Sequence, residues 1–144
     1  MNLGLLGAGL VMGIAALGSA LGIGYAGQST IGAWKKCYIA NKTAPMTLLA
    51  FAGAPLTQTF YGYILMGQVK TAAFANPENA WLYVGFGLAS GFAMAFSAIA
   101  QGKAGAAAAD AQGETGKGFA QYIAVVGIAE TVALFAMVLS MISL

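Results

Sequence analysis

One carboxylate stands in the middle of an apolar stretch that is otherwise uncharged. Glu130 is the one charged residue between positions 118 and 144. An ionised carboxylate at the centre of a membrane span costs roughly 2.5–3.5 kcal/mol or more, so such residues are rare. A protonated glutamic acid in an interhelical hydrogen bond is the structural alternative, although glutamine would serve that purpose at lower cost. A carboxyl group is useful where it alternates between a charged and a neutralised form, as in an ion or proton carrier.

A polar cluster lies on one face of an earlier helical stretch. Thr57, Gln58 and Tyr61 are separated by three- and four-residue steps, which place them on the same helix face. Pro55 removes a backbone donor and loosens carbonyls of the preceding turn, including that of Ala54. In a membrane helix such an oxygen needs a new partner, and a cation can be one. An ordinary proline kink with interhelical hydrogen bonds is the alternative.

Gln101 joins this set through hairpin geometry. A hairpin that bends between Glu114 and Thr115 places Gln101 and Glu130 at nearly equal distances from the bend, and therefore at similar depth. Gln101 could instead be an ordinary polar residue near the end of a long helix. Together the candidates offer a carboxylate, two amide oxygens, a hydroxyl and a carbonyl, a set suited to a hard cation and unsuited to zinc or copper. One negative charge matches one monovalent cation, so we expect sodium, with a proton as the alternative.

The composition restricts the chain to the membrane proteins. Of its 144 residues, 60% are hydrophobic and 7% are charged, whereas a soluble domain is about a quarter charged and a disordered chain is polar. The formal net charge of +2 is too small for the basic stripe of a nucleic-acid-binding protein. With one cysteine, Cys37, and no histidine, the sequence excludes an internal disulfide and the usual zinc sites.

Charged residues divide the chain into four apolar stretches, each longer than the ~20 residues that cross a bilayer. The stretches lack the alternation of strands, so we expect an all-α membrane protein with four transmembrane helices arranged as two tandem helical hairpins. The helices are predicted over residues 3–33, 46–70, 80–109 and 118–143, and the hairpins over residues 1–72 and 73–144. Most of the lysines lie beside the first and third loops, so the positive-inside rule predicts cytoplasmic loops there and external termini.

The two hairpins are similar in sequence, and the first helix is rich in glycine. Residues 19–27 align with residues 97–105, and residues 56–59 align with residues 128–131, which is typical of a duplication. Gly9, Gly13, Gly18 and Gly22 form two pairs of small residues with the spacing of closely packed membrane helices. We expect this narrow helix to line the inside of a closed homo-oligomeric ring, with Gly18 and Gly22 required for the ring.

These features resemble the membrane rotor (proteolipid) subunit of V-type and archaeal-type rotary ATPases, and most closely its sodium-pumping bacterial members. The resemblance covers essentially the whole chain. The stretches that carry it are Pro55-Leu56-Thr57-Gln58 with Tyr61-Gly62, Ala100-Gln101-Gly102-Lys103, and Ala129-Glu130-Thr131.

The resemblance implies a role for each candidate residue. Glu130 would be the ion-binding carboxylate, and Tyr61 would donate a hydrogen bond that holds it in place. The remaining ligands would be three side-chain oxygens and one backbone carbonyl, from Gln101, Thr57, Gln58 and Ala54.

The resemblance also implies partners. Identical subunits would form the ring in a bacterial cell membrane, in contact with lipid, with a stator subunit that bears an arginine and with central-stalk subunits. The chain has no phosphate-binding loop, so ATP hydrolysis would take place on partner subunits. No nucleic acid is expected as a partner, because the net charge is small. The alternative is a stand-alone small four-helix ion-coupled transporter, a class that carries its membrane carboxylate in the first helix.

Overall fold

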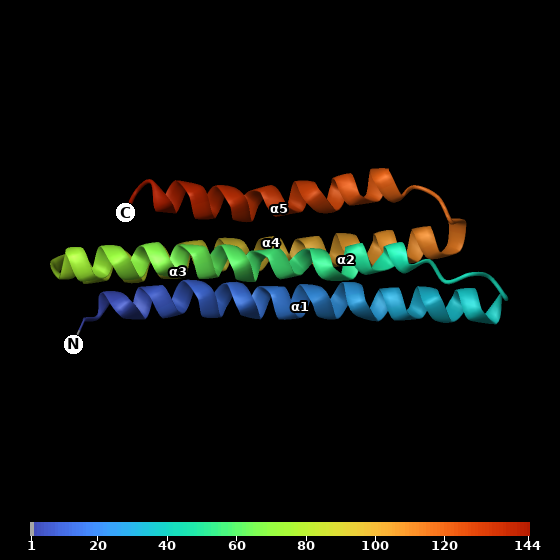
Figure 1. The fold of residues 1–144 in the computed structure, drawn as a ribbon, viewed down its shortest axis with the longest axis horizontal. Helices are drawn as coiled ribbons and strands as arrows, with labels where there is room; N and C mark the ends of the chain where they lie inside the picture. Colours follow the sequence, from blue (N-terminus) through green and yellow to red (C-terminus); the bar gives the residue numbers. More distant parts are fainter. Residues whose placement is uncertain (1) are drawn as a thin grey trace.

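The computed structural model describes residues 2–144, which form long helices that run side by side (Figure 1). α1 (Gly4–Ile39) is followed by a second helical run that consists of η1 (Met46–Leu48), α2 (Leu49–Gly53), η2 (Ala54–Leu56) and α3 (Thr57–Ala75). The third run consists of η3 (Pro77–Asn79) and α4 (Ala80–Thr115), and α5 (Phe119–Met141) is the fourth. The described residues contain no strand, as the sequence predicts.

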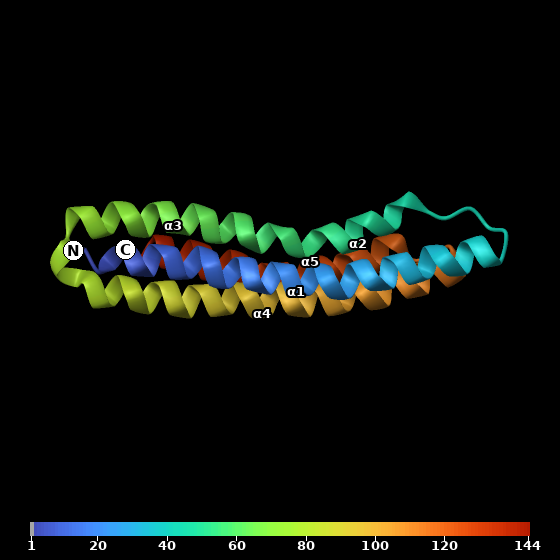
Figure 2. The ribbon, with the colours of Figure 1, turned by 90° about the horizontal axis from the view of Figure 1, so that it is seen from below.

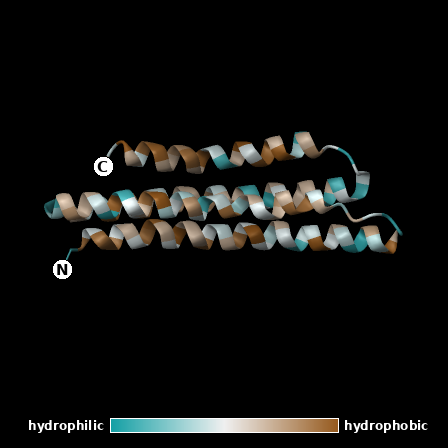
Figure 3. Cartoon of the chain, in the orientation of Figure 1, coloured by the Kyte–Doolittle hydropathy of each residue, from teal (hydrophilic) through white to brown (hydrophobic). Residues whose placement is uncertain are grey.

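The four runs alternate in direction, so both termini lie at one end of the molecule (Figures 1 and 2). α1 packs closely along α4, α3 contacts both of these helices, and α5 packs against α4 and α3. Residues 40–45 and the turn between α4 and α5 therefore lie together at the opposite end. Figure 3 shows that hydrophobic residues dominate the lengths of the runs, while hydrophilic residues concentrate near the connections.

The prediction of four transmembrane helices is supported for three of them. Within residues 2–144, the helices Gly4–Ile39, Pro77–Thr115 and Phe119–Met141 are long and apolar enough to cross a membrane. The predicted helix 46–70 is present as a helical run, but a 3-10 turn at Ala54–Leu56 interrupts it. The longest part of this run, α3, contains polar residues such as Gln58, Gln68 and Lys70, which lower its mean hydropathy. The fourth span is therefore not confirmed by length and composition.

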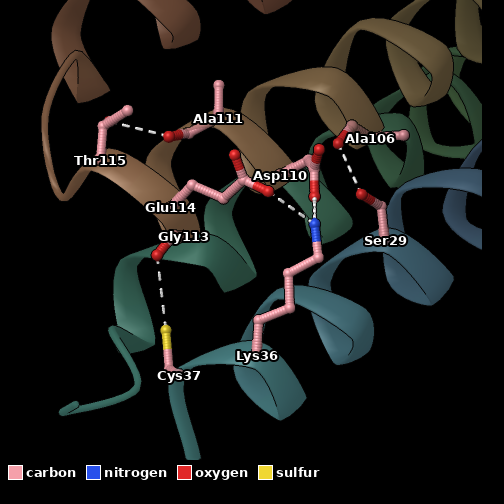
Figure 4. A network of polar contacts seen from close by, with 9 residues as sticks. All are labelled: Ser29, Lys36, Cys37, Ala106, Asp110, Ala111, Gly113, Glu114 and Thr115. Atoms are coloured by element: carbon pink, nitrogen blue, oxygen red, sulfur yellow. Dashed lines mark hydrogen bonds and ion pairs between the residues drawn. The ribbon is translucent and has the colours of Figure 1, made fainter. Parts of the chain in front are cut away.

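The helices extend further than their apolar stretches indicate. α1 continues to Ile39 rather than 33, α3 to Ala75 rather than 70, and α4 to Thr115 rather than 109. Charges taken as the limits of helices lie within them. At the end of α1, the Nζ atom of Lys36 lies 2.8 Å from Asp110 and 2.7 Å from Glu114 on α4 (Figure 4). All three side chains are about half exposed, so the pairs contribute little to stability. Exposed charged side chains are compatible with a helix, so α1 and α4 continue beyond their apolar stretches.

Two glycines with positive φ end the long α4 helix and begin the last one. Gly116 at φ 68° caps the C-terminus of α4, and Gly118 at φ 88° precedes α5. This backbone region favours glycine, which has no Cβ to clash. The hairpin therefore bends between Thr115 and Phe119, a few residues beyond the predicted bend.

The glycines of α1 divide into two pairs with different surroundings. A Cβ added at Gly18 or Gly22 would collide with the backbone of α4 in the same chain. A Cβ added at Gly9 or Gly13 would meet open space. Gly18 and Gly22 therefore permit the close approach of α1 and α4 within one chain, and a role of these two residues in the ring would act through the packing of each subunit.

Cys37 lies within a helix, although the predicted helix ends at residue 33. Rather than being a loop thiol, it lies in α1 with 3% of its surface exposed, and its Sγ lies 3.5 Å from the carbonyl oxygen of Gly113 (Figure 4). The reason is the same extension of α1, which carries residue 37 into the contact with α4.

Two apolar clusters leave a polar layer between them. One cluster includes Leu65, Met94 and Ala133, and the other includes Phe51 and Val126. Along α3 and α5 the residues between these clusters are those that the sequence analysis selected. The fold thus places the candidate site at an intermediate depth in the bundle, with tight apolar packing on either side.

Candidate cation-binding site

Glu130 lies on α5 and receives hydrogen bonds from two other helices. The hydroxyl of Tyr61 on α3 donates to its Oε1 atom, and the Nε2 atom of Gln101 on α4 lies 3.3 Å from its Oε2 atom. The carboxylate is partly buried, on a helix whose other side chains are largely exposed. The three helices therefore hold the single carboxylate of the polar layer at the edge of the bundle rather than in its centre.

Two glutamines connect Glu130 to the interior. Gln58 on α3 and Gln101 on α4 are both fully buried. Nε2 of Gln58 donates to Oε1 of Gln101 over 2.8 Å, and Nε2 of Gln101 donates to the carbonyl oxygen of Val126 over 3.1 Å. A buried amide without partners would be costly, so this chain of bonds fixes the orientation of both side chains.

The interrupted helix supplies two further oxygens. Pro55 lacks the N–H that a continuous helix would use, and the chain forms a 3-10 turn over Ala54–Leu56 before α3 begins. The Thr57 hydroxyl lies 3.0 Å from the carbonyl oxygen of Ala54 and 3.3 Å from Oε1 of Gln58. Three oxygens from the break and the first residues of α3 therefore lie close together, on the side of Gln58 away from its nitrogen.

The sequence-predicted residues are thus joined in one continuous network. It runs from Tyr61 through Glu130, Gln101 and Gln58 to Thr57, and it ends at the Ala54 carbonyl. The orientation of the Gln101 amide differs from the one that a cation shell requires. Gln101 presents its amide nitrogen rather than its oxygen to Glu130, so these two residues now share a hydrogen bond where a cation would require two oxygens.

The donor set fits a hard monovalent cation better than a transition metal. The described residues contain no group of three or more His, Cys, Asp or Glu side chains that could hold a metal ion. Neutral oxygens and one carboxylate are ligands for ions such as sodium, and a single negative charge balances a single positive one. The arrangement can bind and release one such ion, or bind and release a proton on Glu130, without any covalent step.

Sequence reasoning missed Ser97 on α4. Its hydroxyl donates to the carbonyl oxygen of Ala129 over 2.6 Å, and it lies 3.5 Å from Nε2 of Gln58. Its position four residues before Gln101 could have indicated that it lies at the site, because residues four apart lie on one face of a helix. In the sequence alone, Ser97 stands out only as part of the duplicated segment.

Two comparisons with known proteins bear on the family of this chain. Residues 84–143, which contain Gln101 and Glu130, match the family of the C subunit of ATP synthase. The chain is also similar to the A-type ATP synthase subunit K of Methanocaldococcus jannaschii, with 38% identity over 100 residues. That alignment covers 69% of this chain and 42% of the archaeal subunit, so the chain spans less than half of the curated relative.

Both comparisons lead to the family that the motifs indicate. The apolar helices and the multi-pass fold are those of an integral membrane protein, as the family match also supports. The predicted family is confirmed: the chain is related to the c/K-type rotor proteolipids of the rotary ATPases.

Proposed function

We propose that this chain is the ion-carrying rotor subunit of a rotary ATPase membrane sector and that each copy carries one sodium ion at Glu130. The observation that carries the proposal is the convergence on Glu130 of side chains from α3 and α4, next to the oxygens of the α3 break. The rotor role is supported by the family match together with the position of Glu130. The choice of ion is supported by the oxygens of the site.

The position of Glu130 suits transport by rotation. A carboxylate that is neutralised by a bound cation can face lipid, whereas a bare carboxylate cannot do so without a large penalty. In the proposed cycle, copies of the chain form a closed ring, and each site moves through lipid only when loaded. At the stator the ion leaves, and an arginine of the stator subunit stabilises the bare carboxylate. ATP hydrolysis on partner subunits, connected through the central stalk, drives the rotation of a V-type pump.

The choice of sodium over a proton follows from the number of oxygens. A proton site needs only Glu130 and one hydrogen-bond acceptor. Ala54, Thr57, Gln58 and Gln101 add four oxygens within one hydrogen-bonded network, and sodium requires several oxygens around one point. Binding would rotate the Gln101 amide, or shift it, so that its oxygen replaces its nitrogen beside the carboxylate.

The proposed topology places all four helical runs across the membrane as two hairpins. The broken run over residues 46–75 packs against α1, α4 and α5, and the polar side chain of Gln58 is buried among them rather than exposed to lipid. The end that carries residues 40–45 and the α4–α5 turn would face the cytoplasm, since Lys36, Lys42 and Lys117 lie there. A bacterial cell membrane remains the expected location.

Equilibrium binding of radioactive sodium to the purified, detergent-solubilised assembly tests the proposal. We expect one sodium ion per chain in the wild type and none in Glu130→Gln, which keeps the shape of the side chain and removes its charge. Glu114→Gln serves as the matched control, because that carboxylate lies at the other polar network, beside Lys36. Equal sodium binding by the wild type and E130Q would contradict the site.

A further inference from the structure

Ser97 is a buried hydroxyl at the candidate site that has no place in the proposed cation shell. Its Oγ atom donates to the carbonyl oxygen of Ala129, the residue before Glu130, over 2.6 Å. The same Oγ atom lies 3.5 Å from Nε2 of Gln58. One hydroxyl on α4 therefore connects α3 to the segment of α5 that carries the carboxylate.

The two ends of the Gln58 amide face in different directions. Its Oε1 atom lies 3.3 Å from the Thr57 hydroxyl, on the side of the α3 break where the carbonyl of Ala54 is also found. Its Nε2 atom points to Gln101 and Ser97. The nitrogen must keep this orientation if the oxygen is to serve a cation, because an N–H directed at a cation is repelled by it.

Loading the site removes one of the two acceptors that hold this nitrogen. The Oε1 atom of Gln101 now accepts from Gln58 over 2.8 Å, and the proposed cation would draw the same oxygen toward itself. Gln58 is fully buried, so its Nε2 atom would then lose a partner in a place that water does not reach. Ser97 is the remaining acceptor, and its lone pairs are available because its proton is donated to Ala129.

We propose that Ser97 is a positioning residue of the cation site, which holds the amide nitrogen of Gln58 in the loaded state and so keeps the Gln58 oxygen on the cation. This inference rests on the proposed function. Ser97 does not touch the cation or Glu130; it acts through Gln58. It therefore affects the affinity for a cation that uses Gln58, and it does not affect the binding of a proton to Glu130.

The chain offers two matched controls. Ser90 lies on the same helix and is also buried, and its hydroxyl forms a 2.6 Å bond to Ser140 of α5. Ser90→Ala thus removes a hydroxyl bond between α4 and α5 away from the site. Ser19, which aligns with Ser97 in the first hairpin, is buried and its hydroxyl has no hydrogen-bond partner among the described residues. Ser19→Ala thus removes a buried hydroxyl without removing a bond.

The experiment measures the dissociation constant of radioactive sodium for the solubilised assembly of each variant. We expect Ser97→Ala to weaken sodium binding by about tenfold, the size of one hydrogen bond, while S90A and S19A bind as the wild type does. Ser97→Thr, which retains the hydroxyl, should restore most of the affinity. In sodium-free buffer, the pH dependence of carbodiimide modification of Glu130 should be the same in S97A and the wild type.

Each other outcome counts against the inference in a recognisable way. Unchanged sodium affinity in S97A would overturn it while leaving the proposed function intact. A shift of the sodium-free pH profile in S97A, or an equal loss of affinity in S90A, would show general loosening of the α4–α5 contact instead of positioning. If the wild type itself bound no sodium, the proposed ion would fail and the role of Ser97 would fail with it.

Discussion

The hydroxyl of Tyr61 donates a hydrogen bond to the Oε1 atom of Glu130, across the interface between α3 and α5. This bond joins a residue of the first hairpin to the carboxylate of the second, so the site is complete only when both hairpins are packed together. It also leaves Glu130 with one oxygen fixed and the other facing Gln101. Tyr61 is therefore the residue best placed to hold the Glu130 carboxylate against α3.

Removal of this hydroxyl should weaken ion binding without unfolding the bundle. In Tyr61→Phe the aromatic ring remains, and Glu130 loses one donor. A hydrogen bond to a charged group contributes about 1.5–3 kcal/mol, so we expect a loss of sodium affinity of about tenfold to a hundredfold. Sodium titration of the solubilised assembly measures it. Tyr63→Phe, an exposed tyrosine on the same helix, is the control and should bind sodium normally; wild-type affinity in Y61F would exclude the proposed role.

The two pairs of α1 glycines should respond differently to substitution. Gly18→Leu or Gly22→Leu forces a side chain into the backbone of α4, so we expect the chain itself to be destabilised by about 1–3 kcal/mol or more. Thermal unfolding followed by circular dichroism measures this effect. Gly9→Leu and Gly13→Leu, which meet open space within the chain, should leave its unfolding unchanged and reduce the fraction of intact ring in native mass spectrometry. The same unfolding temperature for all four variants would refute the distinction.

The membrane orientation can be tested with single cysteines at the two ends of the bundle. Because Cys37 is buried, it is replaced with serine, and the exposed positions Tyr38 and Trp81 are each changed to cysteine. We expect an impermeant maleimide to label Y38C only in inverted vesicles and W81C only in right-side-out vesicles. The reverse pattern would show that residues 40–45 are external. Labelling of both from one side would contradict the antiparallel crossing.

The sequence was sufficient to predict which polar residues of α3, α4 and α5 meet and the depth at which they do so. Glu130 stands out because charge in an apolar span is costly, and Pro55 marks the break because it cannot donate a hydrogen bond. Gln101 could be placed beside Glu130 because both lie at similar distances from one turn. These arguments depend on the cost of a single residue or on counting along a helix, and neither depends on the details of packing.

The remaining features depend on contacts between helices, which the sequence does not reveal. The ends of α1 and α4 could not be predicted, because these helices continue beyond their apolar stretches, and the pairing of Lys36 with Asp110 and Glu114 depends on how α1 and α4 pack. The assignment of Gly18 and Gly22 to contacts within the chain required the position of α4. The orientation of the Gln58 amide and the role of Ser97 likewise depend on which neighbours each polar atom meets.

Protection of Glu130 by sodium tests the central claim most directly. A carbodiimide attacks the protonated carboxyl group, so it should modify Glu130 in sodium-free buffer, as mass spectrometry of the chain would detect. Sodium bound at the site displaces that proton, and we expect millimolar sodium to slow the modification at neutral and alkaline pH. Protons compete for the same carboxylate, so protection should weaken as the pH falls. Modification that proceeds at the same rate with and without sodium, at neutral and alkaline pH alike, would contradict the account and favour a proton as the transported ion.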